Sequence, residues 1–186
     1  MKKIAIFASG SGTNAEAICQ KLAGRDDIKV EVMVCNRRQA GVYERMERMG
    51  VESVFMGKAE WADGARVLDL MRSRGIDLIV LAGFLAYIPP ALIEAYPQRI
   101  INIHPSLLPR HGGPGMYGHH VHEAVLADGD KESGITIHYV DEHVDGGQII
   151  FQATCPVHPD DTPDTLAARI HVLEHAHYPR IVEELA

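Results

Sequence analysis

The segment IAIFASGSGTN, residues 4–14, indicates the fold most directly, because an apolar run passes through a glycine loop into a helical pattern. The run at 3–8 predicts a first β-strand, and 14–23 predicts a helix. Small residues in the loop leave backbone N–H groups bare, and the helix N-terminus adds a field that favours an anion. We therefore expect the loop to bind a phosphate group.

Strand and helix patterns continue to alternate beyond this segment. Further strands are predicted at 28–35, 77–84, 99–103, 134–140 and 148–154, and further helices at 39–49, 59–74, 90–96, 117–127 and 163–185. Alternation through the first hundred residues predicts βαβ units and a parallel sheet. We expect one α/β domain over residues 1–186, Rossmann-like, with a mostly parallel sheet flanked by helices and a C-terminal antiparallel portion.

The last predicted helix has clear signals at both ends. Thr162 is a typical N-cap residue, and Pro163 suits the first helical position. Pro179 removes a backbone donor, so we expect it to kink or end this helix.

Composition narrows the class of protein. The chain has 186 residues, of which 46% are hydrophobic and 23% charged, as expected of a soluble globular domain without a membrane span. A net charge of −7 argues against a nucleic-acid-binding surface. Cys19, Cys35 and Cys155 form no CxxC pair, which favours free thiols in a reducing cytoplasm and no catalytic cysteine.

The block NIHPSLLP, residues 102–109, carries chemistry that a buried strand does not need. Asn102 and His104 lie two residues apart on a predicted strand, so their side chains share one face. An amide can hold a polar oxygen by hydrogen bonding, and an imidazole can exchange a proton near neutral pH. If the fold brings Asp145 of Asp145-Gly146-Gly147 to the imidazole, its charge favours imidazolium. The three residues would suit a reaction in which negative charge develops on a carbonyl oxygen.

A second interpretation of the glycine loop stays open on the residues alone. Gly10-x-Gly12-x-x-Ala15 matches a dinucleotide-binding fingerprint. Arg37 and Arg38 follow the second predicted strand, where an NADP-binding protein places a basic residue. This alternative, a small NADP-dependent reductase, leaves the block at 102–109 unexplained.

Taken together, the motifs resemble those of the folate-dependent formyltransferases. The landmarks are the loop SGSGTN (9–14), LAGFL (81–85), NIHPSLLP (102–109), DGG (145–147) and EHA (174–176). The resemblance implies transfer of a formyl group from 10-formyltetrahydrofolate, as co-substrate, to the amine of glycinamide ribonucleotide (GAR) in purine synthesis. It also implies that Asn102, His104 and Asp145 are catalytic, and that the small-molecule substrates are the partners of a cytoplasmic monomer or homodimer.

The same resemblance implies the binding residues. Gly12, Thr13 and Asn14 would hold the substrate phosphate, and Glu174 the glycinamide part. The folate would contact Leu85, Ala86, Tyr87 and Ile88, two of which we expect to belong also to the core, together with Asn102 and the loop from Asp141 to Asp145. The glycine- and histidine-rich stretch 110–120 is interpreted as a mobile lid, and we expect no metal site.

Overall fold

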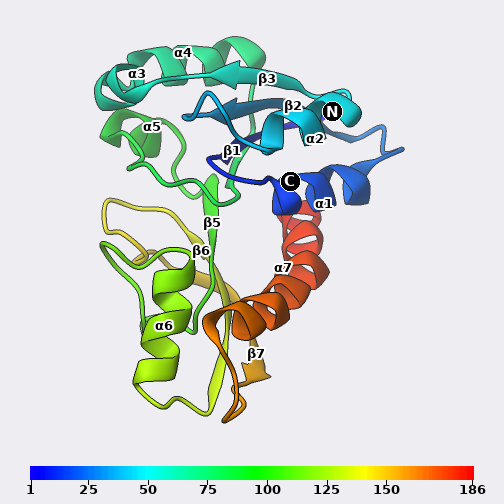
Figure 1. Cartoon of the computed structure of the whole chain (residues 1–186). Helices are drawn as coiled ribbons and strands as arrows, with labels where there is room; N and C mark the ends of the chain where they lie inside the picture. Colours follow the sequence, from blue (N-terminus) through cyan, green and yellow to red (C-terminus); the bar gives the residue numbers. More distant parts are fainter. The chain divides into compact units, whose positions relative to one another are not determined.

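Seven strands form one mixed sheet, in the order β3-β2-β1-β4-β5-β6-β7, in the computed structural model, which describes residues 1–186 (Figure 1). In chain order the strands are β1 (Lys2–Ala8), β2 (Ile28–Cys35), β3 (Glu52–Phe55), β4 (Leu78–Leu81), β5 (Ile100–His104), β6 (Glu132–Tyr139) and β7 (Ile149–Pro156). β1 pairs in parallel with β2 and β4, and β2 pairs in parallel with β3. β6 and β7 are antiparallel. The expected mostly parallel sheet with an antiparallel C-terminal portion is confirmed.

Seven helices connect or follow these strands. They are α1 (Thr13–Leu22), α2 (Val42–Arg48), α3 (Lys58–Asp63), α4 (Ala65–Arg74), α5 (Pro90–Ala95), α6 (His119–Ala127) and α7 (Pro163–Leu185). None of them is long and apolar enough to cross a membrane.

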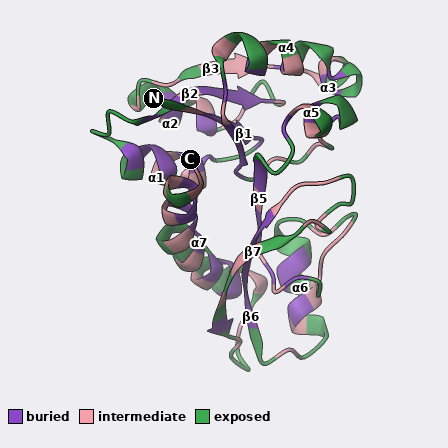
Figure 2. Ribbon diagram, turned by 180° about the vertical axis from the view of Figure 1, so that it is seen from behind, coloured by how far each residue is buried: buried purple, intermediate pink, exposed green.

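The chain divides into two compact units, one of Met1–Ile101 with Tyr178–Ala186 and one of Asn102–His177. In the first unit, β1 is buried from Ile4 to Ala8, as its colour in Figure 2 shows. A cluster of aromatic rings joins Phe7 of β1 to Trp61 of α3 and to Phe84 after β4, with ring centroids 4.6–5.6 Å apart. The cluster fixes the segment that leaves the end of β4.

In the second unit, side chains of β6 and α7 supply much of the core. Ile135 and Ile137 of β6 are fully buried, and Leu166 and Ile170 of α7 are buried one helical turn apart. Thr162 caps α7 as expected, because the Thr165 N–H donates to Thr162 Oγ1 at 3.2 Å. Thr165 Oγ1 in turn accepts from the Thr162 N–H at 2.9 Å, so the cap is reciprocal.

Three features differ from the expectations. β3 was not predicted, because Glu52–Phe55 is short and only partly buried. The helix expected at 59–74 is two helices, α3 and α4, which meet at Gly64 with φ of 76°. Of the two outcomes expected of Pro179, an end of the helix is not seen, since α7 continues to Leu185, and a kink there stays a prediction. Tyr178, Ile181 and Val182 around it are buried, and this packing outweighs one lost backbone hydrogen bond.

Candidate active site

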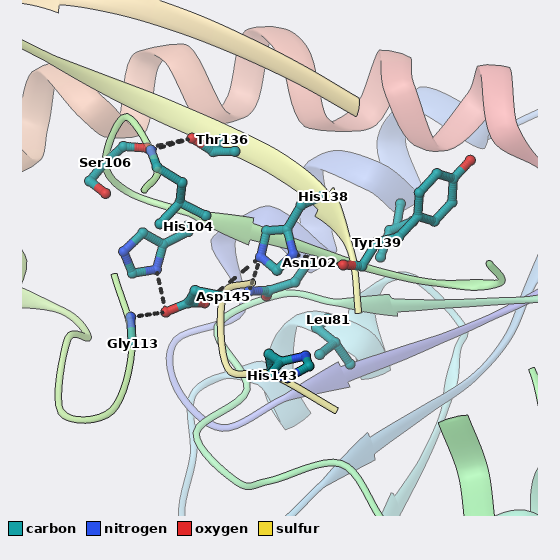
Figure 3. Close-up of polar contacts among 12 residues, drawn as sticks. Leu81, Asn102, His104, Ser106, Gly113, Thr136, His138, Tyr139, His143 and Asp145 are labelled. Carbon is teal, nitrogen blue, oxygen red and sulfur yellow. Dashed lines mark hydrogen bonds and ion pairs between the residues drawn. The ribbon is translucent and has the colours of Figure 1, made fainter. Parts of the chain in front are cut away.

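β5 presents Asn102 and His104 at its carboxyl end, two residues apart on the same face of the strand. The His104 side chain is only 4% exposed, and its two ring nitrogens both face oxygen atoms. Nδ1 lies 3.5 Å from Asp145 Oδ2, the contact drawn as a dashed line in Figure 3. Nε2 donates to the His111 carbonyl oxygen at 2.8 Å. A carbonyl and a carboxylate only accept, so an imidazolium with two N–H groups matches both partners at once.

The connection from β6 to β7 places Asp145. Its backbone has a φ of 55°, and its Oδ2 accepts from the Gly113 N–H at 3.0 Å. Two residues later the chain runs against β6 so closely that a Cβ on Gly147 would stand 1.8 Å from the Tyr139 carbonyl oxygen. Gly147 is therefore required for the turn that brings the Asp145 carboxylate to the imidazole.

His138 is the residue of this site that sequence reasoning missed. Its Nε2 lies 3.2 Å from Asn102 Nδ2 and 3.8 Å from Asp145 Oδ1, as the dashed lines in Figure 3 show. Its Nδ1 donates to the Tyr139 carbonyl oxygen at 2.9 Å, which leaves Nε2 as the acceptor for the Asn102 amide. Burial lowers the pKa of His138, which keeps this ring neutral. The available signal was a histidine on the apolar, alternating strand 134–140.

A second layer of hydrogen bonds fixes the turn that follows His104. Thr136 Oγ1, on β6, donates to the Ser106 carbonyl oxygen at 2.7 Å and accepts from the Leu108 N–H at 3.0 Å. Ser106 Oγ donates to the Arg110 carbonyl oxygen at 2.7 Å, as suits a residue that shapes the turn. These bonds give the end of β5 a rigid support.

The stretch 110–120 touches this group through its backbone. The His111 carbonyl receives the His104 N–H, and the Gly113 N–H points at Asp145. His111 is itself anchored, because its Nε2 lies 2.8 Å from Asp130 Oδ2, and Arg110 pairs with the same carboxylate. Opening of this stretch as a lid stays a prediction.

The glycine loop of the first unit is fixed by packing and hydrogen bonds of its own, and its binding of a phosphate stays a prediction. Gly12 has a φ of 78°, and a Cβ on it would stand 2.5 Å from Val42 Cγ2. No side chain caps the N-terminus of α1. The Gly10 carbonyl accepts from the Val42 N–H at 3.1 Å, and the Ser11 carbonyl accepts from Arg45 Nε at 2.8 Å. Thr13 and Asn14, the first residues of α1, are half-buried.

Leu85–Ile88 lies in the first unit, after β4. Leu85 is 46% exposed and Tyr87 is 74% exposed, while Ala86 and Ile88 are half-buried. The expectation that two of the four belong to the core is wrong, because the chain here runs as an irregular segment between β4 and α5. Exposed apolar side chains on a fixed segment are suited to contact a flat ligand.

Glu174 and Asp141, the two remaining expected ligand contacts, lie in the second unit. Glu174 is only 7% exposed, and its Oε2 lies 3.4 Å from His171 Nδ1. A buried carboxylate is suited to bind a cationic or amine group. Asp141 is half-exposed, and its Oδ1 accepts from the His143 N–H at 2.8 Å.

With this geometry in place, the comparison with known proteins identifies the family. Residues 2–182 match the family model described as formyl transferase. The chain belongs to the formyl transferase family. The match crosses both compact units and includes every residue of the site described above.

Similar relatives of this formyl transferase have consistent names. The chain is 41% identical to phosphoribosylglycinamide formyltransferase, chloroplastic, of Arabidopsis thaliana, covering 97% of this chain and 64% of the relative. It is 40% identical to phosphoribosylglycinamide formyltransferase of Bacillus subtilis, covering 100% of this chain and 95% of the relative. The crystal structure of phosphoribosylglycinamide formyltransferase from Streptococcus pneumoniae is 39% identical, with a TM-score of 0.89, and the alignment covers 100% and 99% of the two chains.

The family also decides between the two interpretations of the glycine loop. The NADP-dependent reductase required Arg37 and Arg38 at a 2′-phosphate, and in this formyl transferase the Arg38 guanidinium lies over the Phe55 ring, 4.2 Å from its centroid. The Arg37 carbonyl accepts from the Tyr43 hydroxyl at 2.9 Å. The match to the formyl transferase model includes both the loop and the block at 102–109.

This formyl transferase has three cysteines and one group of three side chains that could hold a metal ion. Cys19, Cys35 and Cys155 are free and buried. Burial raises the pKa of Cys19 to about 11 and also raises that of Cys155, so both thiols stay protonated. Asp141, Glu142 and His143 offer ligand atoms within 4.8 Å of one another on a partly exposed loop. Exposed acidic groups gather in this way without an ion, and we assign them no metal.

Proposed function

We propose that this chain is a phosphoribosylglycinamide formyltransferase, which transfers the formyl group of 10-formyltetrahydrofolate to the amine of GAR in de novo purine biosynthesis. One observation carries the proposal. In a member of the formyl transferase family, a buried histidine has one ring nitrogen toward Asp145 and the other on the His111 carbonyl, with the Asn102 amide held beside them by His138. These groups provide the proton and the hydrogen-bond donors that acyl transfer needs.

In the proposed reaction the GAR amine attacks the formyl carbon directly. A C–N bond forms, the carbonyl oxygen becomes an oxyanion, and the bond from the formyl carbon to the folate nitrogen then breaks. Asn102 donates one amide N–H to His138, which leaves the other N–H for the oxyanion. His104 also donates to the oxyanion and delivers its proton to the departing folate nitrogen. The attacking amine loses one proton, which returns His104 to its protonated form. No covalent enzyme intermediate is needed.

His104 reaches the reacting atoms only after its Nε2–H leaves the His111 carbonyl. The proposed catalytic cycle therefore includes a movement of the stretch 110–120, which would act as a lid. Asp145 keeps the ring in place meanwhile, because its own turn stays fixed where Gly147 packs against the Tyr139 carbonyl.

The proposed binding residues follow the family resemblance. The GAR phosphate binds the backbone of Gly12, Thr13 and Asn14 at the start of α1, where the helix dipole favours it. Glu174 binds the glycinamide part. The folate contacts Leu85, Ala86, Tyr87 and Ile88, together with Asn102 and Asp141.

Two assays on the purified protein test the proposed function. Incubation with GAR and 10-formyltetrahydrofolate is expected to yield formyl-GAR and tetrahydrofolate in equal amounts, and NADPH is expected not to bind. Formyl loss that is independent of GAR, or tight NADPH binding, would overturn the proposal. The proposed enzyme is a cytoplasmic monomer or homodimer whose partners are its small-molecule substrates, in keeping with three free, buried thiols and a net charge of −7.

A further inference from the structure

Ser9 lies between β1 and the glycine loop, and it is 1% exposed. Its hydroxyl uses both its donor and its acceptor capacity. Ser9 Oγ donates to Asn36 Oδ1 at 2.6 Å, and it accepts from the Leu85 N–H at 2.9 Å. Asn36 follows β2 and Leu85 follows β4, so one hydroxyl joins the carboxyl ends of three neighbouring parallel strands.

The Leu85 N–H belongs to the segment Leu85–Ile88 that is proposed to bind the folate. This segment follows Phe84, whose ring centroid lies 4.6 Å from that of Trp61. It ends before Pro89, which packs so closely on Gly64 that a Cβ there would stand 2.5 Å from Pro89 Cβ. The bond to Ser9 fixes the backbone just inside the first of these anchors. Leu85 and Tyr87 can then stay exposed without the segment collapsing onto the core.

We propose that Ser9 is a positioning residue for the folate: its hydroxyl holds the Leu85 peptide in the orientation that presents Leu85–Ile88 to the ligand. The inference rests on the proposed function for the identity of the ligand. Ser9 itself touches no reacting atom. It acts through the Leu85 peptide, which it orders before the folate binds. Binding of the folate then loses no free energy to the ordering of this segment.

The glycine loop next to Ser9 is held by contacts that do not depend on the Ser9 hydroxyl. The proposal therefore predicts an effect on the folate segment and none on the loop. The Gly10 carbonyl is held by the Val42 N–H, the Ser11 carbonyl by Arg45, and Gly12 by its packing on Val42. None of these contacts involves the Ser9 hydroxyl. Removing that hydroxyl should loosen the folate segment and leave the phosphate loop as it is.

The kinetic test compares Ser9→Ala with the unaltered protein. We expect the KM for 10-formyltetrahydrofolate to rise about fivefold to tenfold, a usual effect of one lost hydrogen bond to a partly buried N–H, while kcat and the KM for GAR stay within about twofold. Ser133→Ala is the matched control, because Ser133 is also a buried serine and its hydroxyl has no hydrogen-bond partner. An equal rise of both KM values, or no change in the folate KM, would overturn the proposal.

A second measurement needs neither substrate. Amide hydrogen exchange of the unaltered protein is expected to show a protected Leu85 N–H, and Ser9→Ala should speed its exchange by at least about tenfold while the amides of Thr13 and Asn14 keep their rates. An unprotected Leu85 amide in the unaltered protein contradicts the inference even if the variant does not fold. If the protein fails to transfer formyl to GAR but Leu85 is protected by Ser9, the proposed function fails and the positioning role of Ser9 stands.

Discussion

Both ring nitrogens of His104 face oxygen acceptors, and this suits the proton transfer proposed for it. The Asp145 carboxylate faces Nδ1 and the His111 carbonyl receives Nε2–H. A neutral ring would leave one of these oxygens without a proton. Only a protonated ring could donate to both oxygens, and that is also the form that can protonate a leaving nitrogen.

Replacing His104 with Ala should therefore remove the proton donor and leave the binding residues in place. We expect kcat for formyl transfer to fall by about 10²–10⁴-fold, with the Kd values for GAR and the folate close to those of the unaltered protein. Calorimetric titration and a turnover assay measure the two quantities. His158→Ala, at an exposed histidine, is the control. Turnover at the normal rate would remove His104 from the mechanism.

His138 controls the orientation of the Asn102 amide. His138→Leu deletes the acceptor of the Asn102 N–H, so the amide loses its fixed direction, and we expect kcat to fall by about 10- to 100-fold. His138→Gln keeps an oxygen that can accept, and it should retain more of the activity. Equal losses in the two variants would argue against an orienting role.

The same contact predicts a pH dependence. Burial lowers the pKa of His138, so the ring stays neutral and accepts from Asn102 even below pH 6.5, the ordinary value of a histidine. Once the pH falls through this lowered pKa, Nε2 of His138 gains a proton. It can then no longer accept from the Asn102 N–H, and the two N–H groups repel each other. The kcat–pH profile is expected to lose activity on the acid side for this reason, and His138→Gln should lack that decline.

At the scale of elements, the β6–β7 connection depends on its glycines. Gly147→Ala places a Cβ against the Tyr139 carbonyl, so the connection must shift, and Asp145 shifts with it. We expect a loss of about 1–3 kcal/mol in the free energy of unfolding and a larger relative loss of kcat. Gly57→Ala is the matched control, since its Cβ meets only Phe55 ring atoms at 3.5 Å. Denaturant unfolding and a turnover assay test both. A variant with unaltered stability would show that the turn adapts.

The elements differ in how far the sequence defines them. β1, β2 and α7 carry long apolar or capped patterns, and their bounds agree with prediction to within about a residue. Glu52–Phe55 becomes β3 only because β2 offers it a pairing edge. Gly64 divides a helical pattern that is otherwise continuous, and Pro179 stays inside α7 because its neighbours are buried. At Glu52–Phe55 and at Pro179, therefore, strand pairing and burial outweighed the local sequence signal.

The stability of the whole molecule should depend on pH through a histidine outside the catalytic group. His122, on α6, is buried, and its Nδ1 has no hydrogen-bond partner. Burial, and then the charges of His119, His171 and His104, lower the pKa of His122 from 6.5 to about 4. The unfolded chain binds this proton below pH 6.5 and the folded chain does not, so the free energy of unfolding decreases as the pH falls from 6.5 towards 4.

Between pH 7 and pH 5, His122 is expected to lower the free energy of unfolding by about 2 kcal/mol. His122→Leu should remove this contribution. His138 acts in the same direction, so part of the slope remains in the variant. Urea unfolding at the two pH values provides the measurement, with the exposed His120→Gln as control. An unchanged slope in His122→Leu would exclude His122 as the source.

The sequence alone determined the α/β class, the mixed sheet and the family, because periodic apolar runs and short motifs are local properties of the chain. It also singled out Asn102, His104 and Asp145. Only the tertiary structure showed that His138 holds the Asn102 amide and that the Ser9 hydroxyl holds Leu85. Both contacts join residues far apart in the chain. The pairing of the strands determines which of these residues come into contact, and the spacing of motifs along the chain does not predict it.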